Sequence, residues 1–318
     1  MKKSFIKKLK KYAVKIIFFM KPAWYTMKKF FFCICILFAK SSKLQPSKKI
    51  NTLLIVSLTS YGTRVKSSTP YAVYSLMRQK VLPNKIVLWL DNDNWNKQNI
   101  PFLLKKLERL GLEIRFCEDL KSYKKLIPAL MEFPNDTIIT ADDDVYYAQD
   151  WLKLLIHEHE KKPQKIICHR ARRIEMDDNH NPLSYEKWNF FSHKNYCHYE
   201  EYVFPTSGGG VLYPPHSLHK DVMKKKLFLK LSPMADDIWY WAMAIINKEY
   251  FGINAPFVVV PNGYNGHLHA VETPHPTALY FNNSKGGNDT QFKAVLDYYP
   301  QIYHTLKNNR IPTSLNNA

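Results

Sequence analysis

The stretch Thr137-Ile138-Ile139-Thr140-Ala141-Asp142-Asp143-Asp144 decides the fold of this chain. Its first five residues are apolar or β-branched, which is typical of a buried strand, and three acids follow directly. Three adjacent carboxylates repel one another, so a strand that delivers them to one loop implies a countercharge, most simply a divalent cation with oxygen ligands. Residues i and i+2 of an extended segment point the same way, so we predict that Asp142 and Asp144 bind the metal. The alternative is an exposed acidic turn that caps a following helix.

On both sides of this stretch, short β-branched runs alternate with amphipathic segments. The pattern predicts an α/β fold with a mostly parallel sheet. We expect strands over 52–58, 85–90, 113–117, 136–141 and 257–260, and helices over 70–79, 101–110, 121–131, 150–161 and 238–247. Pro128 should lie in the last turns of its helix or kink it. Ligands of such sheets bind at the carboxyl ends of the strands, which here precede the loops after Ser57, Leu90, Cys117 and Ala141.

A second acidic pair, Asp236-Asp237, stands before the apolar run Ile238-Trp239-Tyr240-Trp241. Acids at the start of a helix stabilise it by about 1 kcal/mol, but one acid is enough for that. A carboxylate partly desolvated among aromatic side chains has a raised pKa and can accept a proton from a hydroxyl. We therefore interpret Asp237, with Asp236 as second candidate, as a general base.

Three consecutive glycines, Gly208, Gly209 and Gly210, precede Val211-Leu212-Tyr213. Such a run indicates a backbone that approaches a ligand closely or adopts positive φ, and the alternative is a tight turn between strands. The chain has neither a P-loop pattern nor a GxGxxG after a strand, so ATPase and dinucleotide-binding functions are not indicated. His267 and His269, at i and i+2, are candidates for an additional metal ligand or for phosphate binding.

The net charge of +19 is concentrated at the N-terminus, because residues 1–50 contain fourteen lysines and no acid. The rest of the chain is only mildly basic, so we do not expect nucleic acid as a partner. The five cysteines lack CxxC spacing, which argues against a disulfide framework or a zinc site.

Residues 2–20 show apolar side chains at helical spacing, with lysines on another face. The second apolar run, 30–39, is too short for a bilayer, which requires roughly 20 residues. We therefore expect residues 1–40 to lie on an anionic membrane surface. The alternatives are a signal peptide, a spanning anchor or a solvated tail. We divide the chain into a membrane-interface segment and linker (1–49) and a catalytic domain (50–318), with halves at about 50–162 and 163–318.

Several motifs occur in an order that resembles bacterial glycosyltransferases of the A-type fold near family 2, which build surface polysaccharides such as lipopolysaccharide or capsule. They are residues 57–64 (SLTSYGTR), 119–126 (DLKSYKKL), 140–144 (TADDD), 208–215 (GGGVLYPP) and 236–239 (DDIW). The resemblance covers roughly residues 52–300, and the motifs are more specific together than singly.

The resemblance implies a nucleotide-sugar donor and a glycan or lipid-linked acceptor. The donor-binding residues would be Thr59, Tyr61, Arg64, Asp91, Lys124, Lys125 and Asp143. Asp142 and Asp144, with His267 as a candidate third ligand, would hold Mn²⁺ or Mg²⁺ against the diphosphate. The acceptor or sugar loop would comprise Gly208, Gly209, Gly210 and Trp239, and Trp188 is a further aromatic that can stack on a sugar.

In an inverting reaction, Asp237 would deprotonate the acceptor hydroxyl, whereas a retaining enzyme needs no such base. The protein would be cytoplasmic and peripheral at the inner face of the cell membrane. Two alternatives are a membrane-associated non-catalytic scaffold for glycan assembly and a nucleic-acid-binding protein that uses its basic tail.

Overall fold

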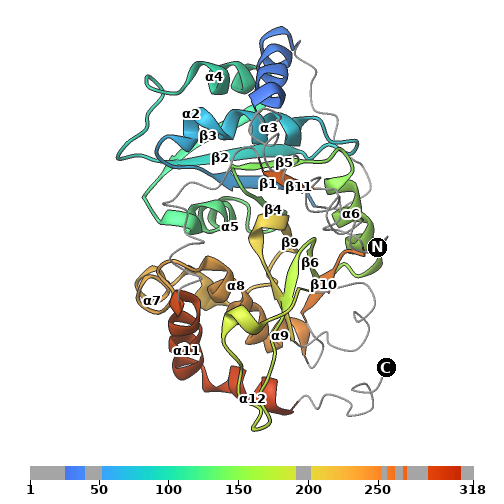
Figure 1. Ribbon diagram of the computed structural model, residues 1–318, viewed down its shortest axis with the longest axis vertical. Coiled ribbons are helices and arrows are strands. Elements are labelled where there is room, and N and C mark those ends of the chain that lie inside the picture. Colours follow the sequence, from blue (N-terminus) through green and yellow to red (C-terminus); the bar gives the residue numbers. More distant parts are fainter. Residues whose placement is uncertain are drawn as a thin grey trace, which may run out of the picture.

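The computed structural model describes residues 26–39, 52–190, 202–252, 256–261, 268–270 and 286–308. A seven-stranded sheet in the order β10-β6-β9-β4-β1-β2-β3 runs through the molecule (Figure 1). Its neighbouring strands are parallel except at β9, which is antiparallel to both β4 and β6. The predicted α/β class with a mostly parallel sheet is confirmed.

The strands of this sheet are β1 (Leu54–Thr59), β2 (Lys85–Asp91), β3 (Leu112–Cys117), β4 (Thr137–Ala141), β6 (Ile166–Cys168), β9 (Val211–Tyr213) and β10 (Phe257–Val259). Two small antiparallel sheets pair β5 (Val145–Tyr147) with β11 (Leu268–Ala270) and β7 (Ala171–Arg173) with β8 (Val203–Pro205). The helices named in Figure 1 are α2 (Arg64–Ser67), α3 (Thr69–Met77), α4 (Phe102–Arg109), α5 (Ile127–Glu132), α6 (Trp151–Lys161), α7 (Lys225–Leu231), α8 (Asp236–Ile245), α9 (Lys248–Phe251), α11 (Asn288–Tyr298) and α12 (Pro300–Asn308).

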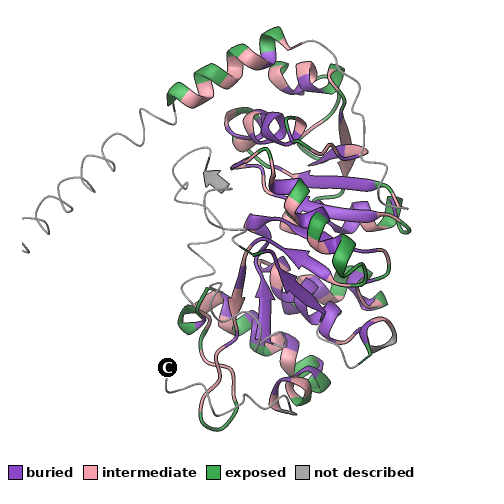
Figure 2. Cartoon of the chain, turned by 90° about the vertical axis from the view of Figure 1, so that its right-hand side faces the viewer, coloured by how far each residue is buried: buried purple, intermediate pink, exposed green. Residues whose placement is uncertain are grey.

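Alternation along the strands creates a hydrophobic core on each face of the sheet. In β1, Leu54 and Val56 pack with α3, α4 and α6, whereas Ile55 packs with the core that contains α7, α8 and α11. Successive side chains of a strand point to opposite faces, so a strand covered on both sides is apolar throughout. Figure 2 accordingly shows most strands of the main sheet buried, whereas the edge strand β3 is largely of intermediate burial.

The sequence-based elements of the first half agree with the structure to within a few residues, except around Pro128. The predicted helix over 121–131 is wrong, because a 3₁₀ helix (Lys121–Lys125) is followed by the separate helix α5. Pro128 lies in the first turn of α5, where its missing N–H removes no intrahelical hydrogen bond. The break leaves Lys124 and Lys125 at the end of the 3₁₀ helix, beside β1 and β2.

The second half contains elements that the sequence did not indicate. The strands β5 to β9 have three residues each, which is too short for a periodic pattern. The C-terminal stretch, for which no helix was predicted, forms α11 and α12, and Ile302 and Leu306 of α12 are buried.

Residues 26–38 form a helix that packs on the rest of the protein. Its Phe32 and Ile36 join the core that contains α3. Residues 2–20, predicted to form an amphipathic helix, lie outside the described residues. Among the residues that the structure describes, no helix has the length and apolarity needed to cross a membrane.

The topology brings the predicted motifs to one edge of the sheet. The parallel strands β1, β2 and β4 end there, at Thr59, Asp91 and Ala141. Because β9 is antiparallel to β4, with Val211 opposite Thr140, the glycine loop that precedes β9 lies at this same edge. Thr140 and Val211, 71 residues apart in the sequence, thereby become neighbours.

Candidate active site

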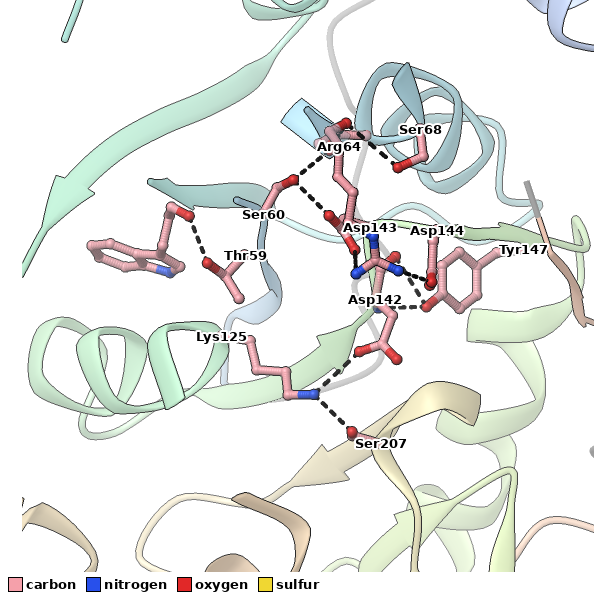
Figure 3. Close-up of polar contacts among 12 residues, drawn as sticks. Thr59, Ser60, Arg64, Ser68, Lys125, Asp142, Asp143, Asp144, Tyr147 and Ser207 are labelled. Atoms are coloured by element: carbon pink, nitrogen blue, oxygen red, sulfur yellow. Dashed lines mark hydrogen bonds and ion pairs between the residues drawn. The ribbon is translucent and has the colours of Figure 1, made fainter. Parts of the chain in front are cut away.

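The acid loop, Asp142 to Asp144, follows the carboxyl end of β4 (Figure 3). The backbone N–H of Asp142 donates to the hydroxyl oxygen of Tyr147 at 2.6 Å. This hydrogen bond closes the loop between β4 and β5. The carboxylate of Asp142 is partly exposed and points toward Lys125.

Asp143 turns away from Lys125 into a buried hydrogen-bond network. Its Oδ2 accepts from the Ser60 hydroxyl at 2.5 Å, and its Oδ1 lies 3.0 Å from Nη1 of Arg64. The other amino group of Arg64 pairs with Asp144. Burial raises the pKa of Asp143 to about 7, with the charges of Asp144 and Asp142 adding to the effect and Arg64 opposing it. Asp143 thus lies apart from Asp142, as expected, but it shares Arg64 with Asp144, so the common orientation of Asp142 and Asp144 toward a metal stays a prediction.

Lys125 is almost completely buried at the centre of the site. Its ammonium nitrogen lies 3.2 Å from Asp142 Oδ1, 3.2 Å from Asp236 Oδ2 and 2.7 Å from the Ser207 hydroxyl. Burial disfavours the charged form, yet Asp142, Asp236 and Asp237 raise the pKa of Lys125 well above its ordinary value. Lys125 is therefore a fixed cation between the acid loop, the glycine loop and α8.

Asp236 and Asp237 are the first two residues of α8. This agrees with the prediction that the two acids stand at the start of a helix. The backbone N–H of Ser207 donates to Asp237 Oδ1 at 3.1 Å. Desolvation by burial raises the pKa of Asp237 to about 7, with Asp236 adding to the effect and Lys125 opposing it. A carboxylate with this pKa can accept a proton at neutral pH. Asp236 is instead ion-paired with Lys125 and buried.

All three glycines of the glycine loop lie against protein groups, and at Gly209 and Gly210 the contact is too close for a side chain. A Cβ at Gly209 would lie 2.7 Å from the Arg170 Cβ, and one at Gly210, where φ is +94°, would overlap the Trp151 indole. A Cβ at Gly208 would lie 3.4 Å from Asp142 Oδ2. The positive φ predicted as one reason for the run is present at Gly210, whereas the close approach to a ligand stays a prediction. Among the three glycines, Gly208 borders the acid loop.

The remaining predicted donor residues lie at the ends of β1 and β2. Thr59 donates its hydroxyl to the Trp89 carbonyl oxygen at 2.9 Å, and the Tyr61 ring is exposed beneath the Arg64 guanidinium. Asp91 is buried and accepts two hydrogen bonds from Asn94. Lys124 lies 3.5 Å from Asp91 Oδ2 and 2.7 Å from Asp119 Oδ1. The structure brings these groups to one edge, and their contacts with a donor remain predictions.

Two aromatic candidates for sugar stacking belong to the core instead. Trp239 is fully buried, and its indole N–H donates to the Val222 carbonyl at 3.2 Å. Trp188 is also buried, and it donates to the Leu183 carbonyl at 2.8 Å. The assignment of Trp239 to the acceptor or sugar loop is therefore wrong, because neither face of its ring is open to a ligand.

His267 lies outside the described residues. The backbone of His269 is in β11, in register with Tyr146 of β5.

Sequence reasoning missed Arg170, Ser60 and Ser207. Arg170 follows β6 and donates from Nε to the Thr206 hydroxyl at 2.6 Å, beside the glycine loop. Its position after the strand Ile166–Cys168 was the only available signal, and a three-residue strand is too short to be recognised. The two serines carried no signal of their own.

The oxygen donors of the acid loop fit a hard divalent cation that also binds a diphosphate. Mg²⁺ is commonly held by one or two carboxylates together with substrate phosphates and water. Burial raises the pKa of Asp144, with the charge of Asp142 adding to it and that of Arg64 opposing it. The carboxylates of Asp142 and Asp144 therefore repel each other, and a cation bound between them would relieve this repulsion. Among the described residues, no group of three or more His, Cys, Asp or Glu side chains could hold a metal.

Residues 126–218 match the sequence pattern of glycosyl transferase family 2. This segment contains the acid loop and the glycine loop, and it ends before α8. Over this segment, the match confirms the resemblance to family 2 glycosyltransferases that the motifs predict.

The solved structures that are similar to this chain include the following two. The S. aureus protein TarS (residues 1–349, in complex with UDP) is 14% identical over 83% of this chain and 73% of its own, with a TM-score of 0.44. The mannosyltransferase PcManGT from Pyrobaculum calidifontis, in complex with GDP-Man and Mn²⁺, is 11% identical over 92% of this chain and 79% of its own, with a TM-score of 0.46. No curated protein matches the sequence at a significant level.

Proposed function

We propose that this glycosyltransferase is metal-dependent and inverting, and that it moves a sugar from a nucleotide-sugar donor to a hydroxyl of a cell-surface glycan precursor. The observation that carries the proposal is the position of Asp237. Its carboxylate is held by the Ser207 N–H, its pKa is raised to about 7, and Lys125 connects α8 to the acid loop. These contacts support the proposal because they would join the proposed proton acceptor and the proposed diphosphate site in one network.

In this reaction the acceptor oxygen attacks the anomeric carbon of the donor sugar, and its proton passes to Asp237. A new C–O bond forms while the bond from the anomeric carbon to the diphosphate oxygen breaks. The electron pair leaves with the nucleoside diphosphate. Asp142 and Asp144 would hold Mn²⁺ or Mg²⁺, which supplies positive charge for the departing diphosphate.

The nearby cations have separate functions in this proposal. Arg64 is ion-paired to Asp143 and Asp144, so it is close enough to contact a diphosphate at the acid loop. Lys125 stays between Asp142 and Asp236 and orients both. The acceptor class is supported by the family resemblance and by the basic N-terminal segment, which suits a lipid-linked glycan.

The proposal is tested by separating donor binding from transfer. The full-length chain is screened by thermal shift and calorimetry against UDP-, GDP-, CMP- and dTDP-sugars, with and without Mn²⁺, because a ligand that binds only the folded state raises its stability. Asp142→Asn and Asp144→Asn should abolish metal-dependent donor binding. Asp237→Asn should keep that binding and lower transfer by about 10²- to 10⁴-fold.

The surface variant Asp297→Asn, which changes an exposed ion pair with Lys293, serves as the matched control. It should bind donor and transfer sugar as the wild type does. Full turnover by Asp237→Asn would refute the assignment of the base, and donor binding that is insensitive to metal would refute the metal dependence.

A further inference from the structure

The helix formed by residues 26–38 is apolar on two faces, one of which packs on the catalytic domain. The Phe32 ring lies 5.1 Å from the Tyr146 ring and 5.4 Å from the Tyr74 ring, both with edge-to-face geometry. Ile36 is completely buried, and the Lys28 ammonium lies 4.1 Å from the centre of the Tyr146 ring. These contacts fix the helix against α3 and β5.

The opposite face, which we call the outer apolar stripe, is exposed. It consists of Met27, Phe30, Phe31, Ile34, Leu37 and Phe38, whose exposed fractions range from 39% to 79%. Intervals of three and four residues place such side chains on one side of a helix. Figure 2 shows the exposed residues along this helix at one end of the molecule. A contiguous apolar surface of this kind marks an interaction site.

The charge of the N-terminal segment indicates what covers the stripe. Residues 1–50 contain fourteen lysines and no acid. A second copy of the chain would bring the same charge to the contact and be repelled. Anionic lipid headgroups instead attract lysines, while the acyl boundary beneath them accepts phenylalanine and leucine.

We propose that the outer apolar stripe inserts into the interface of an anionic lipid bilayer, with the helix lying in the plane of the membrane. Since its other face is buried against α3 and β5, lipid can reach only one side of the helix, which fits a surface position. This arrangement agrees with a peripheral location at the inner face of the cell membrane.

The docking also fixes the membrane relative to the acid loop. Tyr146, whose ring contacts Phe32 and Lys28, lies on β5 and follows Asp144 by two residues in the sequence. The helix therefore holds one end of the catalytic domain, including β5, at a set height above the bilayer. A lipid-linked acceptor would then be presented at a constant distance from the site, a consequence that rests on the proposed function, whereas lipid binding itself does not.

Vesicle sedimentation of the full-length chain, without donor or acceptor, tests the proposal. Two vesicle types are compared, phosphatidylcholine alone and an equal mixture of phosphatidylcholine and phosphatidylglycerol. The wild-type protein should sediment with the mixed vesicles and much less with the neutral ones, and high salt should weaken the binding because it screens the lysines.

The double variant Phe30→Ser/Phe38→Ser should lower partitioning to the mixed vesicles by at least about tenfold. Both side chains are largely exposed, so its thermal melting point should equal that of the wild type. Tyr298→Ser, which removes an exposed aromatic on α11 at the other end of the molecule, is the matched control and should bind normally (Figure 1).

Equal vesicle binding by the double variant and the wild type would overturn the proposal. So would a wild-type dimer, detected by light scattering, that the double substitution converts to a monomer, because the stripe would then be a contact between two copies. If the wild-type protein bound the mixed vesicles but transferred no sugar from any donor, the proposed function would be refuted and the membrane proposal would stand.

Discussion

The ammonium nitrogen of Lys125 lies 3.2 Å from Oδ2 of Asp236, and the same nitrogen lies 3.2 Å from Oδ1 of Asp142. One buried cation thus joins the start of α8, which carries Asp237, to the predicted metal-binding loop. Removing one partner from a buried ion pair is costly because it leaves an uncompensated charge. The two acidic clusters are therefore coupled through a single side chain.

Lys125→Met should reduce sugar transfer by about a hundredfold or more, because Asp142 and Asp236 would lose the cation that orients them. It should also shift the pH dependence. Lys125 lowers the pKa of Asp237, so its removal raises that pKa further above about 7 and moves the acid limb of kcat to higher pH. Steady-state kinetics across pH measure both effects.

Two further variants distinguish the effect of losing the Lys125 charge from a general loss of structure. Lys125→Arg keeps the cation and should retain part of the activity with the acid limb near its wild-type position. Lys293→Met, which removes an exposed lysine paired with Asp297, should leave kinetics unchanged. A Lys125→Met enzyme with a wild-type pH profile would contradict the proposed coupling.

The sequence predicted the acid loop and α8 because their signals are local. The run from Thr137 to Ala141 is continuously apolar or β-branched, and Asp236 and Asp237 stand directly before an apolar helix. The pairing of Lys125 with both clusters was not predictable, since it depends on the break at Pro128 and on the antiparallel strand β9. The burial of Trp239 was not predictable for a different reason. A helix with aromatic residues on all sides does not reveal which of them face a ligand.

The acid limb of the wild-type pH profile should lie at about 7. Asp237 must be unprotonated to accept the hydroxyl proton, and burial raises its pKa to about 7, so activity rises as the pH increases through that value. Below it, kcat should fall by about tenfold per pH unit. The pKa of Asp143 is also raised to about 7, so this carboxyl group is a second possible source of the limb.

Asp143→Asn distinguishes the two carboxyl groups. If Asp237 is the origin, Asp143→Asn keeps the acid limb, whereas the residual activity of Asp237→Asn lacks it. The opposite result, a limb that disappears only in Asp143→Asn, would transfer the pH dependence to the Arg64 network.

Trp239→Phe should destabilise the protein without altering acceptor binding. The substitution leaves a small cavity and removes the indole N–H that donates to the Val222 carbonyl. Together these effects should lower the free energy of unfolding by about 1–3 kcal/mol. Urea denaturation measures the stability, and the KM for acceptor should stay at the wild-type value. A large increase in that KM with unchanged stability would place Trp239 at the acceptor after all.

Gly210→Ala should be among the more damaging single-methyl substitutions in the site. At Gly210 φ is +94°, and a Cβ there would overlap the Trp151 indole, whose N–H donates to the Gly209 carbonyl at 2.8 Å. Strain and overpacking should together lower the free energy of unfolding by about 2 kcal/mol or more. The matched control is Gly252→Ala, at φ +59° with no atom within 4 Å of its added Cβ, which should cost only about 1 kcal/mol.

Because the displaced loop also holds Ser207 against Asp237 and Lys125, Gly210→Ala should lower kcat even at temperatures where the variant is fully folded. Equal stability of the two alanine variants would show that contact with Trp151 does not determine the shape of the glycine loop.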